Sequence, residues 1–308
     1  PLDEPEQERD LMLDLYSTQV RRFIRTYYAT RAQGCFDHAS RNNEGIRGTV
    51  VVTFTIAADG TIPSAPYVAL TLAVLQRFGV GIELAPSSVV GEGVHRYLVG
   101  GPLRAPEGSF AIEPCASSAA VALAAGCLSG GAVSVEALGS ESLQPDLACI
   151  ELLRAFGCSA EAELGRLVAT GRPTRGARPD LTGAPDLAPV AAALGADAAL
   201  RGLGPTELSG LGTLPGKESS RIAVLARGLN ALGLRTEATE DSLCIEAGAS
   251  LPTSQRPVVL DPAGDHRMAF GFALLGLVRA DVRVLDPGCV AKSWPTFWVD
   301  LETAGARR

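Results

Sequence analysis

Three charged residues that lie close together, Lys217, Glu218 and Arg221, are the strongest candidates for chemistry in this chain. We predict a helix over 217–232, because apolar residues recur at intervals of three and four from Ile222 onward. Lys217 and Arg221 would then project from one face, beside Glu218. A helix start already has a positive dipole end and free N–H groups, so two further cations there favour an anionic ligand. The alternative is a solvated helix start held by an ordinary salt bridge.

Similar charges stand at the start of other predicted helices. His266 and Arg267 open one such helix, Lys292 opens the last one, and Asp186 lies where another begins. A pseudo-threefold arrangement would bring these helix ends together. Asp186 on its own is also typical of a helix N-cap, and His266 on its own of a capping histidine without a role in proton transfer.

These positions recur because three segments in the later part of the chain repeat one pattern of helix, strand, second helix and one or two strands. The second helices start near residues 143, 217 and 292, a period of roughly 75 residues, which is too long for a solenoid repeat. This period suits a βαβαββ unit used three times around a pseudo-threefold axis. The expected first helices are 117–128, one from 186, and 266–278; the strands are 132–135, 199–203 and 281–285; the second helices are 145–156, 217–232 and 295–302.

Residues 64–99 are expected to form the tail of a fourth unit, with a helix over 68–78 and strands near 81–84 and 97–99. The segment before them has a different pattern, a helix over 8–33 and a strand over 47–56 followed by an Asp-Gly turn signal. We therefore predict a junction between residues 62 and 63.

Three motifs carry a resemblance to a known family: KESSR at 217–221, DHRM at 265–268 and DPGCVAKSWP at 286–295. Together they resemble the EPSP synthase family of enolpyruvyl transferases, over residues 63–308. The resemblance implies an α/β fold in which 108–308 form a lobe of three βαβαββ units and 63–107 a remnant of the second lobe. It covers somewhat over half of a family member. The family's early Lys-Ser segment, Gly-Asn-Ala-Gly-Thr loop and Ser-Ser-Gln segment fall outside it.

The resemblance implies a reaction of the shikimate pathway of aromatic amino acid biosynthesis. The enolpyruvyl group of phosphoenolpyruvate passes to the 5-hydroxyl of shikimate 3-phosphate, and phosphate is released. By the same resemblance Asp186 acts on the hydroxyl proton and Glu218 on the C3 proton. Lys217, Arg221, Arg267 and Lys292 clamp phosphoenolpyruvate, and a neighbouring lysine helps to tune the carboxylate by its charge. The implied substrate-binding residues are Ser64, Tyr67, Arg221, Arg267 and Lys292.

The chain departs from the family pattern at several positions. Ser220 stands where the family usually has aspartate, and Ala65 replaces a lysine, which weakens binding of the shikimate phosphate. Two further family segments are matched with one changed residue each, and we interpret them as structural: Ser117-Ser118 with Cys115 upstream, and Gln144-Asp146 with Pro145 between them.

Residues 1–62 resemble the TonB-like C-terminal domains of bacterial envelope proteins, as an αβ segment. Two hypotheses follow. The chain is either an enolpyruvyl transferase remodelled at its N-terminus, or a non-catalytic anion-binding or interaction module derived from an incomplete transferase. UDP-GlcNAc enolpyruvyl transferase is a weaker enzymatic alternative, because the DHRM and DPGCVAKSWP motifs point away from it.

Composition limits the remaining classes. A net charge of −7 and only 5% aromatic residues argue against nucleic-acid binding. We expect no membrane segment, because no apolar run is long enough, and no signal peptide, because residues 1–15 are acidic. Seven dispersed cysteines favour a reduced, cytoplasmic protein. No cofactor or metal motif is present, and the expected partners are the two substrates, with a partner chain or second copy that covers the missing lobe.

Overall fold

The computed structural model describes residues 50–53, 65–84, 96–100, 104, 111–248 and 257–304. Two compact units make up the chain, 1–47 and 48–308, and all described residues belong to the second unit. The expected helix over 8–33 and the turn after residue 56 lie outside the described residues. The TonB-like resemblance of 1–62 therefore stays a prediction.

A small antiparallel sheet comes first in the described part of the chain. Its order is β1 (Val50–Thr53), β3 (Arg96–Gly100), β2 (Gly81–Leu84), and helix α3 (Ala65–Arg77) precedes β2. The helix and the two later strands agree with the expectation for 64–99. Because β1 pairs with β3, this sheet contains strands from both sides of the boundary expected at residue 62, and that boundary stays a prediction.

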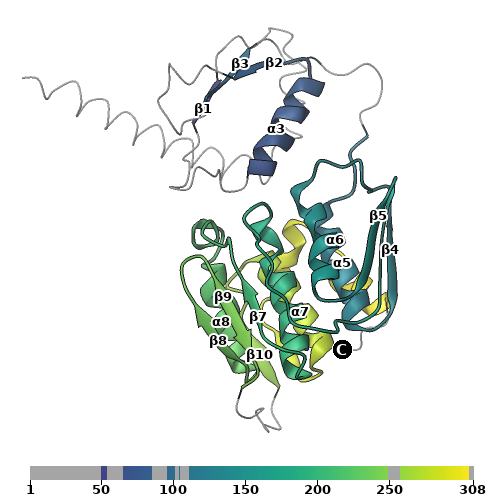
Figure 1. The fold of residues 1–308 in the computed structure, drawn as a ribbon, viewed down its shortest axis with the longest axis vertical. Coiled ribbons are helices and arrows are strands. Elements are labelled where there is room, and N and C mark those ends of the chain that lie inside the picture. Colours follow the sequence, from purple (N-terminus) through teal and green to yellow (C-terminus); the bar gives the residue numbers. More distant parts are fainter. Residues whose placement is uncertain are drawn as a thin grey trace, which may run out of the picture. The chain divides into compact units, whose positions relative to one another are not determined.

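Three repeats follow, each with an inner helix and an outer sheet (Figure 1). The first contains α5 (Ala116–Leu128), β4 (Ala132–Glu136), η1 (Pro145–Ala148), α6 (Cys149–Ala155), β5 (Ser159–Glu163) and β6 (Arg166–Thr170). The second contains η2 (Pro185–Leu187), α7 (Ala188–Leu200), β7 (Thr206–Leu208), η3 (Leu214–Gly216), α8 (Arg221–Ala231), β8 (Arg235–Ala238) and β9 (Leu243–Glu246). The third contains β10 (Val258–Leu260), α9 (His266–Val278), β11 (Val282–Val284), η4 (Pro287–Lys292) and α10 (Phe297–Thr303).

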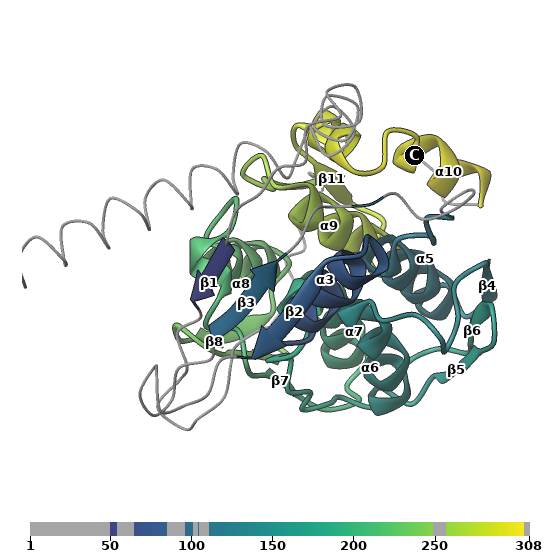
Figure 2. The same cartoon turned by 90° about the horizontal axis from the view of Figure 1, so that it is seen from above.

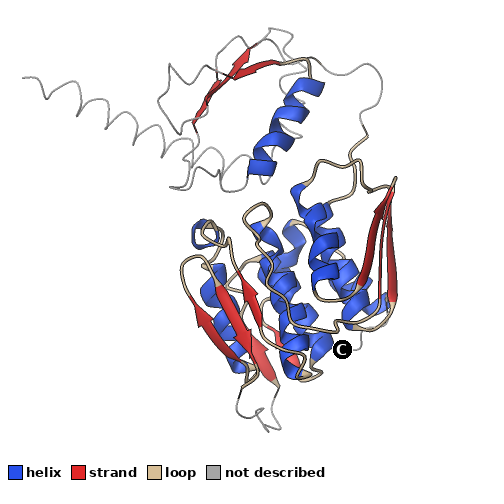
Figure 3. Cartoon of the chain, in the orientation of Figure 1, coloured by secondary structure: helices blue, strands red, loops and turns tan. Residues whose placement is uncertain are grey.

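The sheets have the mixed pairing of a βαβαββ unit. The orders β4-β6-β5 and β7-β9-β8 are antiparallel, whereas β10 and β11 are parallel on either side of α9. In the second repeat the strand before the inner helix is reduced to a parallel bridge between Asp180 and Ser209. Strands lie on the flanks of this lobe and helices in its interior (Figure 3). The predicted α/β class with three repeats is confirmed.

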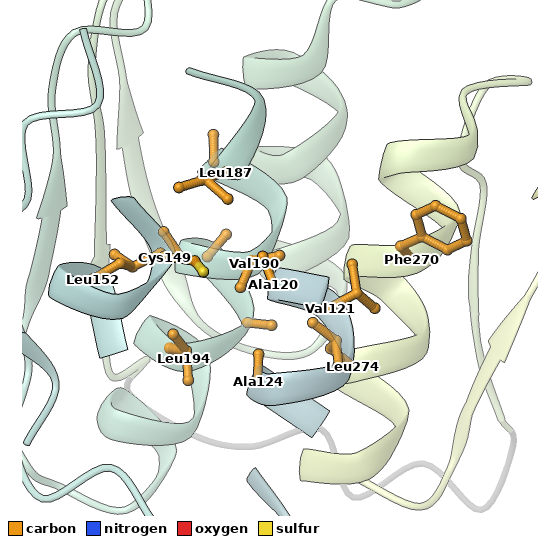
Figure 4. Close-up of a cluster of buried hydrophobic side chains, with 14 of the residues drawn as sticks. Ala120, Val121, Ala124, Cys149, Leu152, Leu187, Val190, Leu194, Phe270 and Leu274 are labelled. Carbon is orange, nitrogen blue, oxygen red and sulfur yellow. The ribbon is translucent and has the colours of Figure 1, made fainter. Parts of the chain in front are cut away.

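The inner helices α5, α7 and α9 pack directly against one another (Figure 2). All three are apolar around most of their circumference, as expected for helices surrounded by protein, and α5 and α7 are rich in alanine. Gly271 of α9 permits the closest approach, because a Cβ there would lie 2.8 Å from the Cβ of Pro189 on α7. Figure 4 shows side chains from α5, α6, α7 and α9 meeting in this core.

Three sequence predictions about the lobe were wrong in detail. Residues 199–203 are not a strand: the alanine-rich α7 continues to Leu200, and the strand is β7. Helix α8 starts at Arg221, so Lys217 and Glu218 lie in the bend before it. Lys292 ends η4 and does not open α10, which begins only after Pro295.

Candidate active site

The charged residues singled out from the sequence meet at the ends of the inner helices and of α8. Arg221 is the first residue of α8, Arg267 follows the first residue of α9, and Asp186 lies in η2 just before α7. Ion pairs link them directly to one another. The repeat therefore does bring segments far apart in sequence into a single charged network.

Arg221 is the centre of this network. Its side chain is 1% exposed, and its guanidinium donates to Asp265 Oδ2 at 2.8 Å, Asp186 Oδ1 at 2.7 Å and Glu218 Oε2 at 2.8 Å. Burial lowers the pKa of Arg221, but the three carboxylates, Asp265 foremost, raise it more. Because each of its nitrogens already donates to a carboxylate and its side chain is buried beneath them, Arg221 can contact an anionic ligand only if one of these carboxylates moves.

Asp265 fixes both Arg221 and the start of α9. It is fully buried, is the N-cap of α9, and accepts a hydrogen bond from the backbone N–H of Arg267 at 2.9 Å. The Ser219 hydroxyl also donates to it at 3.1 Å. Asp265, and not His266, thus caps this helix.

Asp186 lies among three cations. Its carboxylate is 2.7 Å from Arg221, 3.2 Å from Arg267 and 3.5 Å from the Lys217 amine. Burial raises the pKa of Asp186, but Arg267, Lys217 and Arg221 together outweigh it, so that the pKa falls below its usual value. Asp186 makes no side-chain cap to α7, so the N-cap interpretation is wrong.

Glu218 shares its two oxygens between two cations. Oε1 accepts from the Lys292 amine at 2.7 Å and Oε2 from Arg221 at 2.8 Å. Partial burial raises the pKa of Glu218, but hydrogen bonds from Lys292 and from its own backbone, with the charge of Arg221, bring it down to about 2. With these partners Glu218 is a carboxylate at neutral pH.

Tyr67 of α3 reaches the same network through Asp146. The Tyr67 hydroxyl donates to Asp146 Oδ1 at 2.6 Å, and the Ser117 hydroxyl donates to Oδ2. Burial and the neighbouring Asp146 raise the pKa of Tyr67, which keeps its hydroxyl protonated. Arg267 lies 3.8 Å from Asp146, which ties this pair to Asp186. Ser64, the other expected shikimate-phosphate contact, lies outside the described residues.

His266 stands beside the network with an unused polar atom. Its ring packs edge-on against Phe270, with ring centroids 6.0 Å apart, and its buried Nδ1 has no hydrogen-bond partner among the described residues. Burial, then the charge of Arg267, lowers the pKa of His266. The imidazole is therefore neutral at neutral pH.

An aromatic cluster anchors the segment that carries Lys292. Trp294 packs on Phe297 at 5.2 Å and on Phe270 of α9 at 6.1 Å between ring centroids. The backbone of η4 is thereby held against α9, while the Lys292 side chain stays 43% exposed. Because the backbone is fixed and the Lys292 side chain is partly exposed, the amine can exchange Glu218 for another anionic partner.

Taken as a set, the network balances four carboxylates against four cations: Asp146, Asp186, Glu218 and Asp265 against Lys217, Arg221, Arg267 and Lys292. Exposed cations bind anions, and paired carboxylates can exchange protons with a substrate when their partners shift. Among the described residues no cluster of His, Cys, Asp or Glu could hold a metal ion.

Two acidic residues of the network had no role in the sequence interpretation. The motifs give Asp146 a structural position, and Asp265 enters them only as the first residue of DHRM. An aspartate immediately before a helix that opens with His-Arg predicts a cap, but nothing in the sequence indicates that its second oxygen binds Arg221, 44 residues away.

The chain matches the family model described as EPSP synthase (3-phosphoshikimate 1-carboxyvinyltransferase) over residues 49–301. The chain belongs to the EPSP synthase family. Proteins named 3-phosphoshikimate 1-carboxyvinyltransferase are 38% identical over 247 residues in Nitrosomonas europaea and 34% over 251 residues in Methanoculleus marisnigri. These alignments cover 79% and 80% of this chain but 54% and 56% of the relatives. The chain thus spans about half the length of the curated relatives it matches.

Solved structures agree with this family membership. EPSP synthase from Acinetobacter baumannii superimposes with a TM-score of 0.56 at 26% identity, over 77% of this chain and 54% of that one. The enolpyruvyl transferase NikO from Streptomyces tendae gives a TM-score of 0.57 at 20% identity, over 89% and 59%, which supports the fold alone. In the described part of this chain, no helix is long and apolar enough to cross a membrane.

Proposed function

We propose that this chain contributes the phosphoenolpyruvate half of an EPSP synthase site. The enolpyruvyl group of phosphoenolpyruvate would pass to the 5-hydroxyl of shikimate 3-phosphate with release of phosphate. The observation that carries the proposal is the pairing of Asp186 and Glu218 through one buried arginine, each carboxylate with a second, more exposed cation beside it. The names of the relatives support the substrates.

Addition and elimination assign a task to each carboxylate. The 5-hydroxyl oxygen attacks C2 of phosphoenolpyruvate and gives its proton to Asp186, while C3 receives a proton from Glu218. In the resulting tetrahedral adduct the bond from C2 to the phosphate oxygen breaks, phosphate leaves with the proton that Asp186 holds, and C3 returns a proton to Glu218. Both steps require a carboxylate that can hold and release a proton within reach of the reacting atoms.

The cations divide into two groups by exposure. Lys217, Arg267 and Lys292 are partly exposed and can contact the phosphate and carboxylate of the ligand. Buried Arg221 holds the two reacting carboxylates in place and reaches a ligand only after one of them moves. We propose that Tyr67, held by Asp146, faces the shikimate phosphate together with Ser64.

Phosphate release from phosphoenolpyruvate and shikimate 3-phosphate by the purified chain tests the proposal. We expect release that Lys217→Ala lowers by at least about tenfold, because one cation of the anion clamp is lost. Arg178→Ala is the matched control, since Arg178 is an exposed cation outside the network. Phosphoenolpyruvate binding without any release would instead support the non-catalytic anion-binding module.

The same assay tests the expected second copy of the chain. Release per chain that rises with chain concentration would support assembly. Release per chain that does not change with chain concentration would contradict it.

A further inference from the structure

The chain uses lysine at only two positions, and both are in the network. Of 27 lysine and arginine residues, Lys217 and Lys292 are the two lysines, which leaves 25 arginines. All remaining basic positions are arginine, and both lysines are partly exposed and face a carboxylate. Lysine differs from arginine in having a compact charge with three freely rotating donors, which can exchange partners singly.

Lys292 has the geometry for such an exchange. Its amine donates to Glu218 Oε1 at 2.7 Å, and its side chain is 43% exposed at the end of η4. The aromatic cluster of Trp294 and Phe297 holds the backbone behind it. By contrast, the partner of Glu218 Oε2 is Arg221, which is buried and bound to two further carboxylates. An incoming anion can therefore draw Lys292 away from Glu218, but not Arg221.

We propose that Lys292 is an exchangeable counter-ion of Glu218. When a phosphorylated carboxylic acid binds, its anionic group pairs with the Lys292 amine in place of Glu218, and Glu218 then takes up a proton from solvent. This inference rests on the proposed function. The proton goes to Oε1, the oxygen that Lys292 leaves, and no other bond is made or broken. Ligand binding itself would thus load Glu218 with the proton that C3 requires.

The charges around Glu218 make it the proton acceptor. Lys292 on η4, a backbone hydrogen bond and Arg221 on α8 hold it ionised, so that loss of Lys292 removes one of these three interactions. The other titratable group that faces Glu218 is His266 at the start of α9, whose pKa is lowered mainly by burial. A ligand anion would also favour a proton on His266, and the experiment has to separate the two groups.

Isotope labelling can follow both lysines in the intact chain. Lysine labelled with ¹³C at Cε gives two resonances, because residues 1–308 contain two lysines. Lys217→Arg and Lys292→Arg assign them. On addition of phosphoenolpyruvate at pH 8 we expect the Lys292 resonance to shift, and the size of that shift to change in Glu218→Gln, where the amine has no carboxylate to leave.

Proton counting tests the second half of the inference. The heat of phosphoenolpyruvate binding is measured by calorimetry at pH 8 in buffers of different ionisation enthalpy. At this pH the ligand phosphate, whose second pKa is about 6, stays dianionic. We expect net proton uptake on binding, of less than one proton per bound ligand, because Arg221 stays paired with Glu218. Glu218→Gln should bind the ligand with uptake near zero. His266→Gln and the control Glu240→Gln, an exposed residue between β8 and β9, should keep it.

The outcomes are distinct. Binding with no proton uptake, uptake that persists in Glu218→Gln, or uptake lost in His266→Gln would each overturn this inference and leave the proposed function standing. Absence of phosphoenolpyruvate binding by the unmodified chain, with or without shikimate 3-phosphate, would overturn the proposed function and the inference together.

Discussion

At the scale of single residues, Arg221 has a structural task and, under the proposed function, a second task in the site. It neutralises Asp265, which is fully buried, and it sets the distance between Asp186 and Glu218 by binding both. Buried ion pairs of this kind add little net stability, but losing one member leaves a buried charge without compensation. Arg221 is therefore expected to be intolerant of replacement even where activity is not measured.

Replacing Arg221 by methionine tests this expectation. We predict that Arg221→Met lowers the free energy of unfolding by about 3–5 kcal/mol, because Asp265 remains buried and unpaired. Urea denaturation followed by circular dichroism provides the measurement. Arg227→Met, on the exposed side of the same helix, is the control and should stay within about 0.5 kcal/mol of the unmodified chain. Equal effects of the two substitutions would show that the buried network does not matter for stability.

At the scale of elements, the close packing of α7 on α9 holds the helix ends that carry Asp186 and Arg267. Small residues on both helices allow this approach, and Gly271 over Pro189 is its tightest point. Any separation of the two helices would move Asp186 and Arg267 apart, although neither residue is itself changed. The lobe thus controls the site through helix spacing.

Two glycines of α9 provide a matched pair of variants for this idea. An alanine Cβ at Gly271 would lie 2.8 Å from Pro189, whereas nothing lies within 4 Å of one at Gly276. We expect Gly271→Ala to be destabilising, because overpacking costs about 1–3 kcal/mol. Gly276→Ala should stabilise by up to about 1 kcal/mol through helix propensity. Urea midpoints measure both, and a stable Gly271→Ala would show that the helices can separate freely.

The sequence predicted these elements unevenly, for physical reasons. Helix 266–278 is predicted correctly because the segment after Arg267 is almost continuously apolar. The strand predicted at 199–203 is wrong because the segment has no β-branched or aromatic residue, and the alanine-rich α7 continues into it as far as Leu200. The types of the site residues were readable from their motifs. Their pairing was not, because Arg221 meets Asp265 and Asp186 only through the packing of separate repeats.

At the scale of the whole molecule, the balance of charges should make stability depend on pH in two steps. The unfolded chain has ordinary pKa values, near 6.5 for histidine and about 4 for aspartate and glutamate. In the folded chain the pKa values of His266, Asp186 and Glu218 are all lowered, that of Glu218 to about 2. For each group the unfolded state binds the proton more readily, so its contribution is present above the unfolded pKa and is lost as pH falls.

We therefore predict a first loss of stability below about pH 6.5 from His266, and a second below about pH 4 from Asp186 and Glu218. Urea midpoints at pH 7.5, 5.5 and 3.5 measure the two steps. His266→Gln should remove its share of the first step and leave the second. A midpoint of the unmodified chain that rises between pH 7.5 and 5.5 would contradict the lowered pKa of His266.

The confinement of lysine to the charged network also determines how the chain responds to reactive small molecules. Aldehydes and acylating agents attack primary amines, and most proteins present them with many surface lysines that react without consequence. In residues 1–308 the only side-chain amines are Lys217 and Lys292. Side-chain acylation or glycation of this chain therefore falls on the charged network itself, and each modified lysine alters one of its four cations.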